Sequence, residues 1–191
     1  MHKSQLMKYS YVIAFVILAL VQWALPGRTI WEKDQVRKKG QLFKFQTEPV
    51  DPSNPFKGKY ITLNFAENSF TDTLNRGLNG NDQVYVILAK NPQGFVIVQN
   101  ISVEQPESTN AYVRAQVYYV SSEKDSITVH LHYPFDEFYM DEYKAPKAEN
   151  IYRESSRNGA STTYASVKIL NGDAVVENVY INDVPIGQLI K

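Results

Sequence analysis

The sequence contains no cysteine, so disulfide bonds, thiolate catalysis and cysteine-ligated zinc are all excluded. It also has no excess of either charge, because 20 Lys and Arg residues balance 20 Asp and Glu residues. Recognition of nucleic acid usually begins with a basic surface, and this composition does not point to one. The absence of cysteine is compatible with an oxidising compartment without requiring one.

The residues that are abundant indicate a folded, strand-rich chain. Hydrophobic residues make up 43% of the sequence and charged residues 21%, which argues against a disordered chain. The 13 Tyr and 9 Phe residues, with β-branched residues in the middle of the chain, favour strands over helices. Without its N-terminal segment the chain keeps about 150 residues, an ordinary size for one domain.

One long hydrophobic run lies at the N-terminus. Residues 9–27 contain no charged side chain, and a helix of this length spans roughly 28 Å, close to the hydrocarbon thickness of a bilayer. Tyr9, Tyr11 and Trp23 lie near the ends of the run, where interfacial aromatic residues are common. We therefore expect a single-pass anchor that contacts the lipid bilayer through residues 9–27.

A cleavable signal peptide is the alternative interpretation of this run. Cleavage after Ala24 would place Gln22 at position −3, where a small residue is preferred. We therefore expect the segment to be retained as a signal-anchor.

The chain after the anchor begins with a candidate stalk. Pro26 and Gly27 predict a break or a kink in the helix. Helix-compatible spacing then runs from Arg28 to Lys39, as a continuation of the anchor helix or a short stalk, and Gly40 is a stop signal. We expect an N-terminal tail with the anchor, a juxtamembrane stalk and a β-rich soluble domain, over residues 1–27, 28–40 and 41–191.

Positive charges on both sides of the anchor give conflicting indications of its direction. A plain count of the cations that follow it would keep the C-terminal side in the cytoplasm, where Arg37, Lys38 and Lys39 could touch anionic lipid. A short basic N-terminus, here with Lys3 and Lys8, is also how signal-anchors begin. We expect the soluble domain to be extracytoplasmic.

The rest of the chain is typical of strands separated by turns. Asn171-Gly172 is a strong two-residue hairpin signal, and residues 91–94 form a second turn. One helix is predicted over Ala145 to Arg157. Apolar alternation predicts strands at 41–47, 59–65, 84–89, 95–103, 112–120, 127–133, 162–170, 174–182 and 184–190. Together these elements predict a mostly β fold, an antiparallel sandwich or open barrel, with one late α-helix.

The segment Gly58-Lys59-Tyr60-Ile61-Thr62-Leu63-Asn64-Phe65 resembles the motif of the bacterial GDYXXLXY family. Gly58, Tyr60, Leu63 and Phe65 occupy motif positions, with Lys59 in place of Asp and Phe65 in place of the final Tyr. The segments 49–56, 133–139 and 144–149 extend the resemblance to nearly the whole chain. It implies a membrane-anchored protein without an assigned activity. With the orientation expected above, the soluble domain would lie in the cell envelope, on the periplasmic side. The resemblance also implies an accessory role beside multi-pass membrane proteins.

The acidic–aromatic segment, residues 136–143, is the richest candidate for a site. Its acids are interleaved with Phe, Tyr and Met. Two nearby carboxylates with aromatic residues are typical of sugar-cleaving sites. The plainer interpretation is a loop whose aromatic residues fill the core while its acids stay in solvent. A third interpretation is that the segment forms a partner-binding surface.

His130 and His132 are two apart on a predicted strand, so both face the same side and could bind a metal with Asp136. Ordinary half-exposed histidines are the interpretation we favour, so no metal, cofactor or catalytic residue is predicted. We expect a non-enzymatic accessory or binding protein that acts with membrane partners. The alternative is an extracytoplasmic hydrolase or carbohydrate-binding domain that uses residues 136–143. The candidate binding residues are Lys59, Tyr60, Asp136, Glu137, Tyr139, Asp141 and Tyr143.

Overall fold

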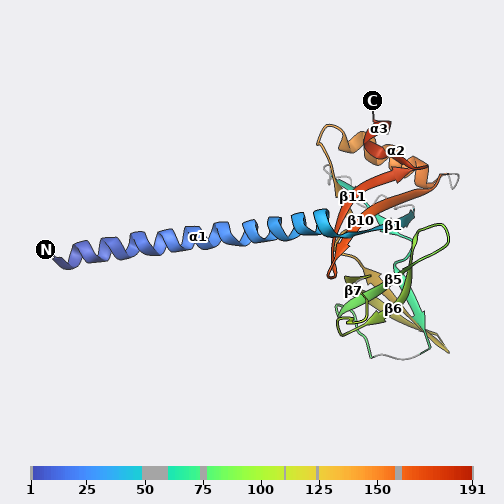
Figure 1. Cartoon of the computed structure of the whole chain (residues 1–191), viewed down its shortest axis with the longest axis horizontal. Coiled ribbons are helices and arrows are strands. Elements are labelled where there is room, and N and C mark those ends of the chain that lie inside the picture. The colour runs from blue at the N-terminus through green and yellow to red at the C-terminus, as the bar shows by residue number, and fades with distance from the viewer. Residues whose placement is uncertain are drawn as a thin grey trace.

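A long N-terminal helix projects from a β-rich domain in the computed structural model (Figure 1). The structure describes residues 2–48, 60–73, 77–109, 111–123, 125–157 and 161–190, with side chains from Tyr11 onward. The helices are α1 (His2–Lys39), α2 (Ala145–Arg157) and α3 (Ile186–Leu189). The strands are β1 (Gln41–Glu48), β2 (Tyr60–Thr62), β3 (Asn64–Phe65), β4 (Ser69–Asp72), β5 (Gln83–Lys90), β6 (Val96–Ser102), β7 (Tyr112–Glu123), β8 (Ser126–His132), β9 (Glu137–Tyr139), β10 (Thr163–Leu170), β11 (Asp173–Ile181) and β12 (Val184–Pro185).

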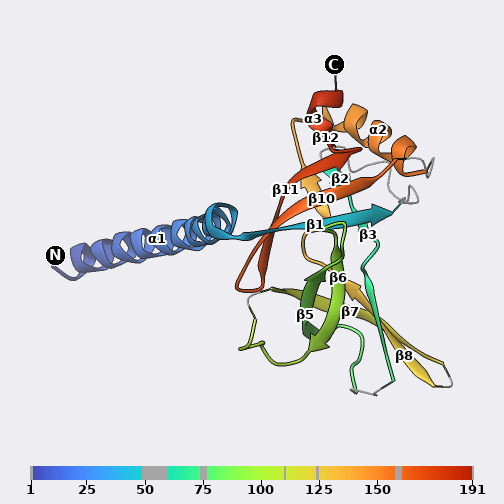
Figure 2. The same cartoon turned by 45° about the vertical axis from the view of Figure 1, so that its right-hand side comes forward.

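The strands form two five-stranded antiparallel sheets and one small sheet. The first sheet has the order β12-β11-β10-β1-β3 and the second β4-β8-β7-β5-β6, while β2 pairs only with β9. The edge strands β4 and β6 of the second sheet approach each other, so this sheet is a nearly closed barrel. Figure 2 shows the first sheet beside α2 and α3, and the second at the opposite end of the domain. The predicted mostly antiparallel β fold with one late helix is confirmed.

One hydrophobic core joins the two sheets. It includes Phe43 and Phe45 of the first sheet and Val86 and Val113 of the second, all nearly inaccessible to solvent. The ring of Phe45 lies 5.2 Å from that of Phe65 in an edge-on contact, and it also contacts the rings of Tyr133 and Phe135. Edge-on aromatic contacts of this kind add to the stabilisation from buried area.

Two-residue turns fix the hairpins at the C-terminal end. Asn171 and Gly172, with φ of 51° and 84°, connect β10 to β11 as the sequence predicts. Both central residues of a type I′ turn need positive φ, which Asn and Gly tolerate well. Asn182 and Asp183 make a second such turn between β11 and β12, with φ of 49° and 64°.

Several predicted elements differ from the structure. The predicted strand 184–190 is wrong beyond Pro185, because the chain turns into α3 and buries Ile186 completely. Proline has no N–H with which to continue the ladder. The predicted strand 59–65 is interrupted at Leu63, and its two parts join different sheets. Strands β4 and β9 were not predicted.

The predicted break at Pro26 is also wrong. Helix α1 runs for 38 residues through Pro26 and Gly27, so the segment from Arg28 to Lys39 continues the apolar helix, which is one of the two arrangements expected for it. Proline removes one hydrogen bond from a helix, and hydrophobic membrane helices commonly accommodate this loss.

Candidate functional site

The family motif and the acidic–aromatic segment lie side by side. Strand β2 pairs with β9 in antiparallel register, which places Tyr60 opposite Tyr139 and Thr62 opposite Glu137. The Tyr60 and Tyr139 ring centroids lie 5.5 Å apart. Two segments that the sequence marks separately therefore form one structural unit. Gly58 and Lys59 lie outside the described residues.

The two faces of the β2–β9 pair have different roles. Ile61 is fully buried, and Phe138 opposite it also packs against the core. Because side chains alternate along a strand, Tyr60, Glu137 and Tyr139 lie on the other face, and Tyr139 is 67% exposed. We call these three residues the β2–β9 surface. The motif residues Leu63 and Phe65, by contrast, are buried in the core.

The hydroxyl of Tyr139 is held by an acid on the same strand. It donates a hydrogen bond to the Glu137 carboxylate. This hydrogen bond raises the pKa of Tyr139 above the ordinary value of a phenol. The pair therefore presents an aromatic ring whose polar end is already oriented.

The other predicted acids have local partners. The Asp136 carboxylate lies 3.9 Å from Nδ1 of His132, and the Asp136 carbonyl accepts a hydrogen bond of 2.7 Å from the Leu63 amide. Asp141 accepts a hydrogen bond of 2.9 Å from the Tyr143 amide, in the turn that leads into α2. Acid–base cleavage of a sugar uses two carboxyl groups that flank the bond, roughly 5–10 Å apart, whereas the contacts of Asp136 and Asp141 are with neighbouring groups of the chain.

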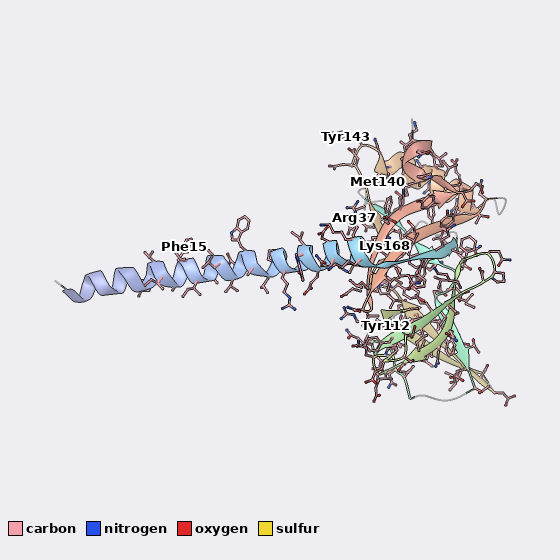
Figure 3. All side chains as sticks on the ribbon, viewed as in Figure 1. Phe15, Arg37, Tyr112, Met140, Tyr143 and Lys168 are labelled. Atoms are coloured by element: carbon pink, nitrogen blue, oxygen red, sulfur yellow. The ribbon has the colours of Figure 1, made fainter. Side chains whose placement is uncertain are left out.

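Tyr143 stands apart from the β2–β9 surface. Its side chain is 94% exposed. Figure 3 shows it on the side of the domain from which α1 emerges. Its side chain is therefore almost entirely open to solvent.

The two predicted histidines of β8 lie in different surroundings. His130 stacks on Tyr119, with ring centroids 4.0 Å apart and planes 15° apart. His132 is exposed beside Asp136. Among the described residues, no group of three or more His, Asp and Glu side chains is arranged to hold a metal ion.

The junction between α1 and the first sheet was missed by sequence reasoning. Val36 is buried, and Nζ of Lys33 donates a hydrogen bond of 3.1 Å to the Ala174 carbonyl on β11. A Cβ on Gly40 would lie 2.4 Å from the Val36 carbonyl oxygen and 3.0 Å from the Ile169 nitrogen on β10. Gly40 thus ends the helix, as predicted, and also lets β10 approach it closely. We call these five residues the α1 junction.

A buried hydroxyl cluster fixes α2 behind the β2–β9 pair. The Thr47 hydroxyl of β1 donates a hydrogen bond of 2.9 Å to the Thr163 hydroxyl of β10, and Ser156 of α2 lies 3.5 Å from the same oxygen. Tyr152 of α2 is also buried, and this burial raises its pKa. The cluster consists of neutral groups and therefore serves to position α2.

Comparison with known proteins identifies a family for this chain. The family model described as GDYXXLXY protein matches residues 22–179, from within α1 to within β11. No curated protein and no solved structure matches the chain. The match covers most of the chain and includes the α1 junction, the β2–β9 pair and α2. The chain belongs to the GDYXXLXY family.

Proposed function

We propose that the protein is a single-pass, membrane-anchored binding protein without enzymatic activity, and that the β2–β9 surface contacts a multi-pass membrane partner. The observation that carries the proposal is the pairing of the family motif with an exposed aromatic strand. Tyrosine is enriched at protein interfaces, because its ring supplies contact area and its hydroxyl a hydrogen bond. The Glu137 contact orients the Tyr139 ring beforehand, which reduces the entropy lost on binding.

The anchoring part of the proposal rests on α1. One helix of the described chain is long and apolar enough to cross a membrane, and its large apolar side chains from Tyr11 to Trp31 are exposed. A core helix of a soluble protein would bury such side chains. A signal sequence has similar length and composition, but here the same helix continues without interruption into the α1 junction. This continuity favours a retained anchor. The extracytoplasmic orientation of the domain is a separate part of the proposal, and its support is the short basic N-terminus before the helix.

The acids of residues 136–143 supply no observation that favours a hydrolase. The Asp136 carboxylate lies 3.9 Å from a histidine nitrogen, Asp141 accepts a hydrogen bond from the Tyr143 amide, and Glu137 accepts one from the Tyr139 hydroxyl. Binding of a partner at this surface would require no rearrangement of these side chains.

Site-specific photocrosslinking in native membranes tests the proposal. Benzoylphenylalanine replaces Tyr139, which is 67% exposed, and in a matched control Tyr118 on β7, which is 72% exposed. We expect a discrete adduct with a multi-pass membrane protein from position 139 and none from position 118. The same adduct pattern from both positions, or no adduct from position 139, would refute the binding role of this surface. A reporter fused after residue 40 tests the orientation, since high cytoplasmic-reporter activity would contradict it.

A further inference from the structure

No hinge separates the apolar part of α1 from the domain. The helix is continuous, and its last turns carry ion pairs four residues apart, such as Nε of Arg28 with Glu32 at 2.7 Å. The α1 junction then holds the helix to the first sheet through Lys33 and the buried Val36. The domain therefore follows the orientation of the helix.

The exposed apolar surface of α1 extends beyond Gly27. Ile30 and Trp31 are 70% and 62% exposed, although they follow Pro26. From Tyr11 to Trp31 the helix rises about 30 Å, which matches the hydrocarbon thickness of a bilayer. Arg28 lies near the end of this stretch, where a long cationic side chain can extend to the headgroups.

The bilayer surface consequently lies close to the domain. Lys33, which is bound to β11, follows Trp31 by two residues, or about 3 Å of helix rise. The side of the domain from which α1 emerges therefore faces the headgroups at short range. Arg37 and Tyr143 lie on this side (Figure 3).

We propose that this side of the domain rests on the bilayer, with Trp31 and Tyr143 in the headgroup region and Arg37 beside the lipid phosphates. Tyr and Trp concentrate at membrane interfaces because their rings combine an apolar body with a polar group. Basic side chains are attracted to anionic lipid. Contacts of this kind set the tilt of a membrane helix, so they would also hold the β2–β9 surface at a fixed angle to the membrane. The inference rests on the proposed anchoring of α1.

The absence of cysteine makes spin labelling a direct test, since any introduced thiol is unique. The full chain is reconstituted in vesicles of phosphatidylcholine and phosphatidylglycerol, with a nitroxide on Trp23→Cys, Tyr143→Cys or Asp125→Cys. Asp125 is exposed and lies in the turn between β7 and β8. Figure 2 shows this hairpin extending away from α1. The measurement is the accessibility of each nitroxide to oxygen, which concentrates in lipid, relative to a water-soluble nickel complex.

We expect the oxygen-to-nickel ratio to be highest at position 23, severalfold lower at 143, and lowest at 125. Equal ratios at 143 and 125, with a high ratio at 23, would overturn the bilayer contact and leave the anchor intact. Low accessibility of position 143 to both reagents would indicate a protein neighbour and would also overturn it. A low ratio at position 23 would instead refute the anchoring on which the inference depends.

Discussion

Replacing Gly40 with alanine tests whether helix α1 is an integral part of the folded domain. The added Cβ would lie 2.4 Å from the Val36 carbonyl oxygen and within 3.1 Å of the backbone nitrogen and oxygen of Ile169. All three atoms belong to the backbone, so no side chain can rotate away. Either α1 or β10 must move, and the hydrogen bond of 2.8 Å from the Gly40 amide to Val36 is disturbed.

The size of the effect follows from the geometry of Gly40. Overpacking of a well-packed site typically costs 1–3 kcal/mol, and clashes with fixed backbone lie at the upper end, so we expect a loss of about 3 kcal/mol. With an m-value of about 2 kcal/mol/M in urea, the unfolding midpoint should fall by about 1.5 M. The assay is urea unfolding of the full chain in mild detergent, followed by circular dichroism of the β-sheet.

Gly187→Ala is the matched control for the Gly40 variant. A Cβ on Gly187 would meet nothing within 4 Å, so this change should leave the midpoint unchanged or raise it slightly. Midpoints for the two variants that agree within experimental error would refute the close packing of α1 on β10. They would also remove the basis for treating α1 and the domain as one rigid unit.

Three further predictions concern the core, the buried hydroxyl cluster and a perturbed tyrosine. Phe45→Ala should lower the free energy of unfolding by about 4 kcal/mol in the same assay, because it removes the centre of the aromatic cluster. The control Leu42→Ala, at a 40% exposed position of the same strand, should lower it much less. Thr163→Val should lower the free energy of unfolding by about 2 kcal/mol, because it leaves buried hydroxyls without a partner. Thr128→Val, in an exposed hydroxyl pair of similar length, should lower it by less than about 0.5 kcal/mol. Equal losses of stability in the two variants would contradict the role of burial. Burial raises the pKa of Tyr164 from 10.0 to about 12, so its contribution to stability is present below pH 10 and is lost as the pH rises toward 12. Tyr164→Phe should therefore reduce the decline in stability between pH 10 and 12, and an unchanged slope would refute this assignment.

Local signals in the sequence predicted much of the fold. Asn171-Gly172 specifies its turn because both positions need positive φ, and the structure has the hairpin there. The helix over Ala145 to Arg157 has the predicted bounds, because its apolar residues recur at helical spacing. These features depend on residues within one turn or one hairpin of each other.

The errors lie where distant parts of the chain decide the structure. Nothing near Leu63 indicates that the residues before it pair with β9 while those after it pair with β1. Apolar and polar residues alternate in the same way before and after Leu63, and the two parts differ only in the strand with which they pair. Strand β9 was missed for the same reason, since it is short and its partner lies far away in the sequence.

The sequence named the residues of the candidate site, but it did not predict that Tyr60 and Tyr139 lie on paired strands. The sequence marks Tyr60 and Tyr139 through separate features, and their pairing required the structure. It also gives equal weight to Glu137 and Asp141, although Glu137 holds a surface tyrosine and Asp141 shapes the turn before α2. Composition cannot distinguish an acid that faces a partner from one that binds its own backbone.

The order of the strands connects α1, the proposed anchor, to the candidate site. Helix α1 packs on β10, β10 pairs with β1, and β1 pairs with β3, which follows β2 after one residue. Every step in this path is a backbone ladder, a buried contact or a direct chain connection. A tether that only had to keep the domain near the membrane would need none of these contacts, and a flexible linker would serve. The direct path from α1 to β2 therefore favours a role in which the angle of the β2–β9 surface to the membrane matters, as it would for binding a partner in the same bilayer.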